Sequence, residues 1–338
     1  MIVDQVVVAH PVVGVDYPGT YQQMREWFGD ERSCLEYLER LRWPGGFVCP
    51  RCDAERVWRT GRGLWMCAVC GRKTSVTAGT IFHRTRTPLS TWFAAIWFVT
   101  STKNGVSATG LQQNLGFGSY ETAWAWLHKL RRAMVRPDRE LLGGVVEVDE
   151  TVVGWVSDGR DGAWTDKVPV MVAVERVGSH KLGRVRLEVA PLPGSLEAVR
   201  FAARVVAPGS TISTDGARMF RRLADMGYTH TFVTAYNAPD PEKVLPGVHR
   251  VASLLKRWLI GTLHYAVSAQ HLPYYLDEYT FRFNRRTARA RGLLFYRLLQ
   301  QAVNTDPHPL TELIHPTGPA RRLLINNGLD HWSLHSSR

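Results

Sequence analysis

VVEVDET, residues 145–151, is the stretch of sequence that decides the fold, because it has the β-branched composition of a buried strand and yet carries carboxylates. Burial disfavours a carboxylate unless a metal ion or an ionic partner compensates its charge. Two further β-branched runs, at residues 168–174 and 185–190, predict that three strands follow one another. The sequence therefore predicts a strand with a functional acidic group, and Asp149 is the candidate.

A second acidic residue, Asp215, stands at the end of another predicted strand, in STDG (213–216). Helix 196–206 is expected before that strand, with helix 217–226, strand 229–235 and a helical region 249–303, broken near 271–273, after it. This order of strands and helices is that of an RNase H-like fold of the α/β class. In that fold the first strand lies centrally beside the fourth, so we expect Asp149 and Asp215 to lie close together.

Two neighbouring carboxylates of this kind could bridge divalent metal ions for in-line attack at phosphorus. Their hard oxygen atoms suit Mg²⁺. The alternative is structural, because Asp before Gly is common in turns, and Glu147 or Glu150 could be a surface ion-pair partner. The residue types alone leave both interpretations open.

Four of the five cysteines form two CxxC pairs separated by 14 residues, namely Cys49, Cys52, Cys67 and Cys70. This spacing indicates a structural Zn²⁺ held by four thiolates in a zinc ribbon over residues 44–83. Its arginines and Lys73 would offer a phosphate-binding surface. A redox dithiol is the alternative. The fifth cysteine, Cys34, lies in an amphipathic helical stretch and is expected in the core.

Residues 86–137 predict three short helices with a glycine turn before the third, which fits a helix-turn-helix arrangement. The third helix would be the recognition helix, with one face in the core and a basic face toward DNA. The expected core residues are Trp124, Leu127 and Leu130. The expected DNA-facing residues are His128, Lys129, Arg131 and Arg132. A plain helical support domain is the alternative.

The formal net charge of +12 is concentrated in two blocks, and the rest of the chain is slightly acidic. Residues 51–139 hold 14 Lys and Arg against 4 Asp and Glu, and residues 249–301 hold 9 against 2. This distribution favours a polyanionic partner that the two basic blocks bind on either side of an acidic catalytic centre. No apolar run is long enough to span a bilayer, and no secretory signal begins the chain, so we expect a cytoplasmic, nucleoid-associated protein.

The remaining segments complete the predicted organisation: a loose leader (1–18), N-terminal helices (19–43), an RNase H-like catalytic domain (143–304) and a C-terminal tail (305–338). Near the end of the catalytic domain, aromatic and cationic residues alternate in YTFRFNRR, residues 279–286. Arg282, Arg285 and Arg286 are candidates for contacts with the DNA backbone. The alternative is that Tyr279 and Phe283 pack in the core while the arginines are solvated.

The chain resembles the insertion-sequence DDE transposases that begin with a zinc ribbon. The resemblance covers about Tyr21 to Val303 and rests on CPRC…CAVC, VEVDET, STDG, LPGVHRVASLLKRWLIGT, HLPYYLDEYTFRFNRR and RGLLFYRLLQQAV. It implies cleavage of DNA at the ends of an insertion element and strand transfer with Mg²⁺, for which Mn²⁺ could substitute. It carries the first two catalytic acids of the family onto Asp149 and Asp215.

The third catalytic position departs from the family pattern, in which a Glu on a helix precedes a Lys or Arg by seven residues. Lys256 fits the basic partner, and the position seven residues earlier is His249. Seven residues are nearly two helical turns, so both would share one face, opposite a packing face of Val251, Leu254, Leu255 and Trp258. Lys256 and its neighbour Arg257 would contact DNA.

His249 is a poorer Mg²⁺ ligand than a carboxylate, so it could instead position a water molecule or accept its proton. Glu150 or Glu242 could then supply the oxygen ligand, and His249 could simply face DNA or solvent. Transposases must bring two ends together, so a homodimer or higher oligomer on double-stranded DNA is expected. The rival functions are a non-catalytic zinc-ribbon DNA-binding protein and an RNase H-like nuclease without joining activity.

Overall fold

The computed structural model describes residues 10–61, 63–136, 139–154, 168–178, 181–190, 194–234, 244–263 and 268–314. The chain divides into two compact units. The first combines Met1–Met134 with Ala288–Pro309, and the second combines Val135–Thr287 with Leu310–Arg338. Each unit is thus built from two separate parts of the chain. In the described residues no helix has the length and apolar character needed to cross a membrane.

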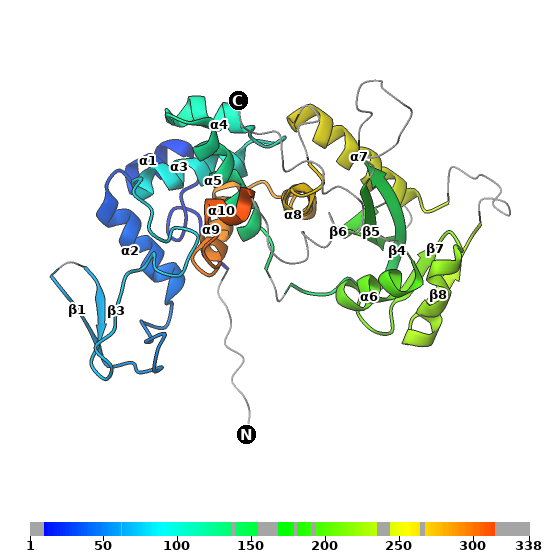
Figure 1. The fold of residues 1–338 in the computed structure, drawn as a ribbon, viewed down its shortest axis with the longest axis horizontal. Coiled ribbons are helices and arrows are strands. Elements are labelled where there is room, and N and C mark those ends of the chain that lie inside the picture. Colours follow the sequence, from blue (N-terminus) through cyan, green and yellow to red (C-terminus); the bar gives the residue numbers. More distant parts are fainter. Residues whose placement is uncertain are drawn as a thin grey trace. The chain divides into compact units, whose positions relative to one another are not determined.

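The first unit consists of helices with the cysteine segment inserted between them (Figure 1). Aromatic side chains of this unit contact one another, among them Phe28, Phe93 and Phe295. Its helices are α1 (Tyr21–Trp27), α2 (Glu31–Arg42), α3 (Leu89–Ser101), α4 (Ala108–Leu115), α5 (Tyr120–Ala133) and α9 (Arg291–Ala302). Side chains cap several of them: the Ser107 hydroxyl accepts from the Gly110 N–H, and the Ser119 hydroxyl accepts from the Glu121 N–H. Gly116, with φ +67°, ends α4 in the left-handed conformation that glycine favours.

Two predicted boundaries differ in this unit. Residues 1–18 were expected to be loose, but Tyr17 is buried and the Tyr37 hydroxyl donates to the Asp16 carbonyl at 2.6 Å. The catalytic domain was expected to run to residue 304, but α9 packs against α2, α3 and α5 of the first unit. Gly292, near the start of α9, lies against the segment before α1, because a side chain at this position would collide with the Pro18 carbonyl.

The second unit is built on a five-stranded mixed sheet in the order β6-β5-β4-β7-β8. The strands are β4 (Val145–Val153), β5 (Val168–Val177), β6 (Lys181–Val189), β7 (Thr211–Thr214) and β8 (Thr229–Phe232). β4, β5 and β6 pair antiparallel, whereas β7 pairs parallel to β4 and β8 parallel to β7. The first strand of the sheet therefore lies beside the fourth, which is the RNase H-like topology that the sequence predicts.

Helices cover both faces of this sheet (Figure 1). The covering helices are α6 (Ser195–Val205), η1 (Arg218–Met226), α7 (Pro246–Leu263) and α8 (Leu272–Asn284). A short helix, α10 (Leu310–Ile314), also belongs to this unit. Val146 and Val148 of β4 join the core with α6 and η1, while Val153 joins the core with α7 and α8. Because successive side chains alternate between faces, the odd-numbered residues of β4 face α7 and α8.

Three local predictions need correction in this unit. The helix expected at 217–226 is a 3-10 helix, and the following strand ends at Phe232 rather than at residue 235. Leu254, expected to pack in the core, is 36% exposed. Val251 and Leu255 pack there as expected, with Trp258 partly buried against the cluster, and Val248 and Leu259 join them. The apolar face of α7 is therefore rotated slightly from the predicted one.

Candidate metal centres and catalytic site

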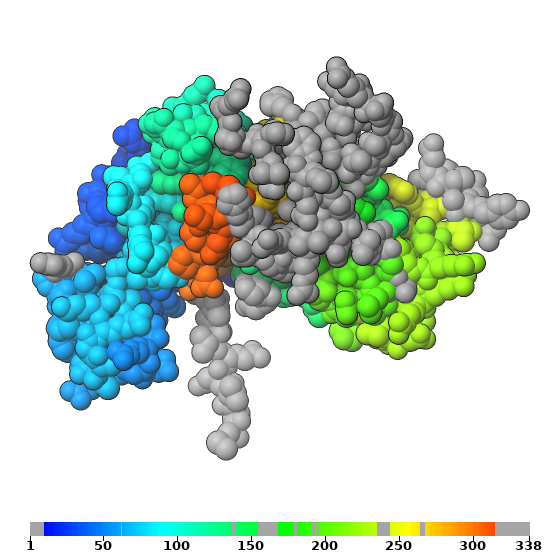
Figure 2. Space-filling model, viewed as in Figure 1, coloured from blue at the N-terminus to red at the C-terminus, as the bar shows by residue number. Residues whose placement is uncertain are grey.

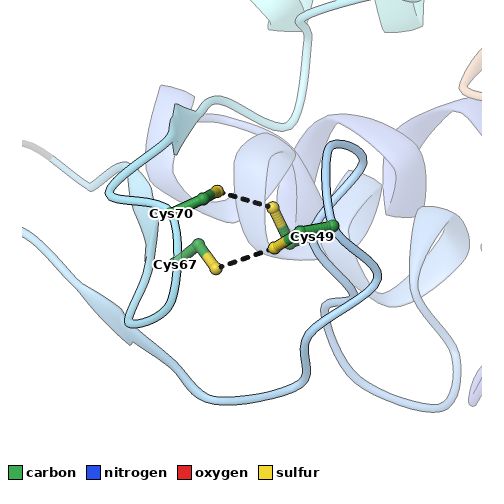
Figure 3. Close-up of side chains that lie close together, drawn as sticks. Cys49, Cys67 and Cys70 are labelled. Atoms are coloured by element: carbon green, nitrogen blue, oxygen red, sulfur yellow. Dashed lines mark hydrogen bonds between the residues drawn. The ribbon is translucent and has the colours of Figure 1, made fainter.

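The four cysteines lie together at one end of a small antiparallel sheet of β1 (Val57–Arg59), β2 (Trp65–Cys67) and β3 (Lys73–Thr74). Their Sγ atoms lie within 4.8 Å of one another (Figure 3). The Sγ–Sγ distance is 3.6 Å for Cys49 and Cys70 and also for Cys52 and Cys67. Thiolates bound tetrahedrally to zinc at about 2.3 Å would be about 3.8 Å apart. The cluster therefore fits one closed, structural zinc site.

The backbone around Cys67 favours its thiolate. The backbone N–H groups of Cys70 and Val69 lower the pKa of Cys67 to about 6, against the opposing effect of burial. The rings of Phe47 and Trp65 stack at 5.5 Å beside the sulfur atoms and shield them on one side. Cys34 is fully buried elsewhere, and burial raises the pKa of its thiol to about 12. Its predicted place in the core is thus confirmed.

Asp149 lies on β4, and Asp215 directly follows β7, the parallel neighbour of β4. Residues 145, 146 and 147 of β4 pair with residues 211, 212 and 213 of β7, and the same offset, continued two residues beyond the last pair, would bring Asp149 opposite Asp215. The negative charge of Asp215 raises the pKa of Asp149, so the two carboxylates are neighbours. Asp149 has the parity of the β4 residues that face α7. The Asp215 carboxylate also accepts from the Ala217 N–H at 2.9 Å, which orients it at the end of its strand.

The electrostatics of Asp149 reflect this neighbourhood. Its pKa is raised to about 6, chiefly by burial and also by the negative charges of Asp215 and Glu150, while the Glu150 N–H and His249 act in the opposite direction. Burial and two neighbouring negative charges raise the pKa of this half-buried carboxyl group, and a bound cation would offset the repulsion between the charges. The oxygen donors of Asp149 and Asp215 therefore fit a hard divalent cation.

His249 lies in the first turn of α7, which begins at Pro246 and packs against β4 and β5. The side chain is exposed, and its effect on the pKa of Asp149 places it in the same electrostatic neighbourhood. Lys256 and Arg257, further along α7, are also exposed. Among the described residues, the four cysteines form a group whose ligand atoms could surround one ion, whereas Asp149, Asp215 and His249 do not close into such a group.

Glu150 and Glu242 are the two alternative oxygen ligands. Glu150 has the opposite parity to Asp149 on β4, so it faces away from α7. Partial burial and the charge of Asp215 nevertheless raise its pKa. Glu242 lies outside the described residues. Glu147 is no surface ion-pair partner, because it is buried and bound to Arg176 and to the start of α7.

The basic face predicted for α5 is largely buried. His128 and Arg131 are only 0% and 2% exposed, so neither is presented to a ligand. Lys129 is half-buried, and burial lowers its pKa. Arg132 is exposed and remains a candidate for DNA contact. Leu127 and Leu130 are in the core as expected, whereas Trp124 is only half-buried. Trp126, which was not expected there, is buried and its ring stacks on Trp92.

The arginines at the end of α8 serve the fold as well. Arg282 donates to Glu278 at 2.7 Å, and Glu278 is 2% exposed, so this ion pair is internal. Arg286 donates to the carbonyls of Leu182 and Gly183 on β6. Arg285 stacks on the ring of Phe281 at 4.2 Å. Arg282 is therefore a structural residue, whereas Tyr279 and Phe283 pack in the core as the alternative interpretation proposed.

Glu147 is the residue that the sequence analysis undervalued. It lies between two valines in an apolar strand, two positions before Asp149, and is thus on the same face. This placement already indicated a buried carboxylate in need of partners. Its partners, Arg176 and the N–H of Val248, could not be identified because they come from other elements.

Comparison with known proteins agrees with both halves of this description. The family of ISXO2-like transposase domains matches residues 141–284, and the transposase zinc-ribbon domain matches residues 29–73. An uncharacterised protein in the transposable element ISH50 of Halobacterium salinarum is 30% identical over 283 residues, which are 75% of this chain and 91% of that protein. With its zinc-ribbon cysteines, its RNase H-like sheet and its paired aspartates, this chain belongs to the ISXO2-like transposase family.

Proposed function

We propose that this transposase binds the ends of its insertion element and catalyses divalent-metal-dependent DNA cleavage and strand transfer. The observation that carries the proposal is the parallel pairing of β4 with β7, whose register, continued by two residues, would bring Asp149 and Asp215 to adjacent positions, together with the effect of the Asp215 charge on the pKa of Asp149. The raised pKa of Asp149 supports the proposal. It reflects the unfavourable energy of an ionised, partly buried carboxylate beside a second negative charge, and a bound cation would remove that penalty.

The residues of the site divide the work in this proposal. Asp149 and Asp215 hold the cation, for which Mg²⁺ is the natural choice and Mn²⁺ a substitute. When bound, the cation supplies charge stabilisation at the scissile phosphate and activation of the attacking oxygen. His249, exposed at the start of α7, positions the attacking water or 3′-hydroxyl, or accepts its proton. Lys256 binds phosphate.

DNA binding follows from the family, and the exposed basic residues indicate where it occurs. On α7 these are Lys256 and Arg257, and on α5 the exposed cation is Arg132. The zinc-ribbon residues Arg51 and Arg72 are also exposed. Contacts of this kind fix the register of the protein on DNA and make the affinity depend on salt. We propose that two copies at least assemble on the paired element ends.

Strand transfer of labelled element-end DNA into a plasmid tests the proposal. The wild type would be compared with Asp149→Ala, Asp215→Ala and His249→Ala in Mg²⁺ and in Mn²⁺. Asp225→Ala provides a matched control, because it removes an exposed carboxylate of the same unit. We expect joined products with the wild type and the control, and none with either active-site Asp variant.

Two other results would identify the rival functions. Cleaved but never joined ends would indicate a nuclease of the same fold. Tight end binding without cleavage in either metal would indicate a DNA-binding protein without catalysis, and would refute the proposal. The His249→Ala reaction decides whether that side chain takes part in the chemistry.

A further inference from the structure

Glu147 is a third carboxylate on β4, and the proposed chemistry does not use it. Only 6% of the residue is exposed. Its Oε1 accepts from the Arg176 guanidinium at 2.9 Å, and its Oε2 accepts from the backbone N–H of Val248 at 3.0 Å. Buried ion pairs contribute little net stability, because desolvation offsets the attraction between the charges. The location of this pair is therefore more informative than its strength.

The bond to Val248 provides α7 with an N-terminal cap from a distant strand. The first N–H groups of a helix have no partner within the helix, and the partial positive charge there favours a carboxylate. The residue before α7 is Leu245 and the first residue of the helix is Pro246, and neither side chain has an oxygen atom that could cap the helix. Glu147 supplies the missing acceptor and thereby fixes the first turn of α7 on β4.

The contact lies next to the proposed catalytic residues on both elements. On β4, Glu147 is two residues from Asp149 and on the same face, about 7 Å along the strand. On α7, the bonded residue Val248 directly precedes His249. Any movement of the first turn relative to β4 would therefore change the distance between His249 and the two aspartates.

Gly247 indicates how closely the two elements approach. A Cβ atom at this position would lie 2.7 Å from the Oε2 of Glu147 and 3.1 Å from the Cδ2 of Leu182. Arg176 holds the carboxylate through its other oxygen, so the carboxylate is not free to rotate away. A methyl group at residue 247 would consequently push the start of α7 away from the strand.

From these contacts we infer that Glu147 is a positioning residue, which holds the first turn of α7 so that His249 faces Asp149 and Asp215. This inference rests on the proposed catalytic function of those residues. Glu147 itself touches neither DNA nor metal in this account. Its effect is transmitted through one hydrogen bond and one close approach.

The test uses Gly247→Ala, Glu147→Gln and Gly261→Ala in the full chain. Gly261→Ala is the matched control, since it makes the same change in the same helix, where a Cβ atom meets nothing within 4 Å. We expect Gly247→Ala and Glu147→Gln to slow single-turnover cleavage by about tenfold, as small misplacements of reacting groups do. DNA affinity should stay within about twofold, because the DNA-facing cations are unchanged. Gly261→Ala should cleave like the wild type.

Two further measurements separate positioning from general damage. Amide hydrogen exchange at residues 248–250 should accelerate in Glu147→Gln, while exchange in β5 stays unchanged. Adding Glu147→Asp to Gly247→Ala should recover part of the rate, because the shorter side chain makes room for the methyl group.

Wild-type cleavage rates in both variants, with unchanged exchange at residues 248–250, would overturn the inference. If Glu147→Gln does not fold, Gly247→Ala and its rescue decide the question. If Asp149→Ala instead cleaves like the wild type, the proposed function fails, and the exchange data still show whether Glu147 holds the first turn of α7.

Discussion

Replacing Asp149 by Asn should stabilise the second unit when no divalent cation is present. The pKa of this carboxyl is raised from 3.8 to about 6, first by burial and then by the charge of Asp215. One pKa unit corresponds to about 1.4 kcal/mol, so the ionised carboxylate opposes folding by at most about 3 kcal/mol. Because the carboxyl is partly exposed, solvent screening reduces the expected gain to about 1–2 kcal/mol.

The gain should depend on pH with a defined sign. The pKa in the folded state lies above that in the unfolded state, so the folded protein binds more protons and the ionised group is unfavourable to the fold. The penalty is absent below about pH 4, grows between about pH 4 and pH 6, and is complete above that range. Asp149→Asn should therefore exceed the wild type in stability at about pH 7.5 and by less at about pH 5.

Urea unfolding, monitored by hydrogen exchange in β4 and β7, measures this effect. A probe within these strands is needed because the two units need not unfold together. The control is Asp225→Asn, an exposed position of η1 in the same unit. The buffer should lack Mg²⁺ but contain no chelator, so that the cysteine-bound metal is kept. Adding Mg²⁺ should stabilise the wild type and not Asp149→Asn. An Asp149→Asn protein that is no more stable than the control, or that Mg²⁺ stabilises equally, would refute the reasoning.

Three further perturbations follow from the same contacts. Cys67→Ser should abolish the one zinc ion per chain that we expect elemental analysis to find, and a zinc-replete variant would contradict the four-thiolate site. Gly216→Ala should slow cleavage far more than Gly209→Ala: both residues have φ near +80°, but only at Gly216 would a Cβ atom meet the neighbouring side chains, at 2.9 Å. Arg282→Ala should lower the free energy of unfolding by about 2–4 kcal/mol, because it removes the guanidinium that binds the buried carboxylate of Glu278. A weaker salt dependence of DNA binding with unchanged stability would instead support the predicted DNA contact of Arg282.

The sheet and its acidic pair could be predicted because their signals are local. The alternation in VVEVDET indicates a strand, STDG indicates a strand end, and the order of elements selects one topology. Once that topology is chosen, the parallel pairing of β4 with β7 leads toward Asp149 and Asp215, and the charge of Asp215 acts on the pKa of Asp149. The zinc cluster was equally accessible, since CxxC spacing places two thiolates on one tight turn.

The burial of individual cations could not be predicted in the same way. Helical periodicity identifies one apolar face. Because α5 packs against both α4 and α9, the buried surface of this helix extends beyond its apolar face. Arg131 is buried as a result of contacts that periodicity does not contain. Glu278 and Arg282 did carry a local signal, the i,i+4 spacing of a helical ion pair. The edge strand β8 belongs to the yellow-green part of the chain in Figure 2. No local sequence signal fixed the end of this strand at Phe232, which is 60% exposed.

The central claim is that Asp149 and Asp215 hold the catalytic cation through their side-chain oxygens. Cleavage of element-end DNA by Asp215→Cys, compared in Mg²⁺ and in Mn²⁺, tests this claim most directly. A thiolate is a poor ligand for Mg²⁺ and a better one for a softer cation. We predict that Asp215→Cys is inactive in Mg²⁺ and recovers cleavage in Mn²⁺, while Asp215→Ala stays inactive in both. Equal activity of Asp215→Cys and the wild type in Mg²⁺, or cleavage by Asp215→Ala, would contradict the account.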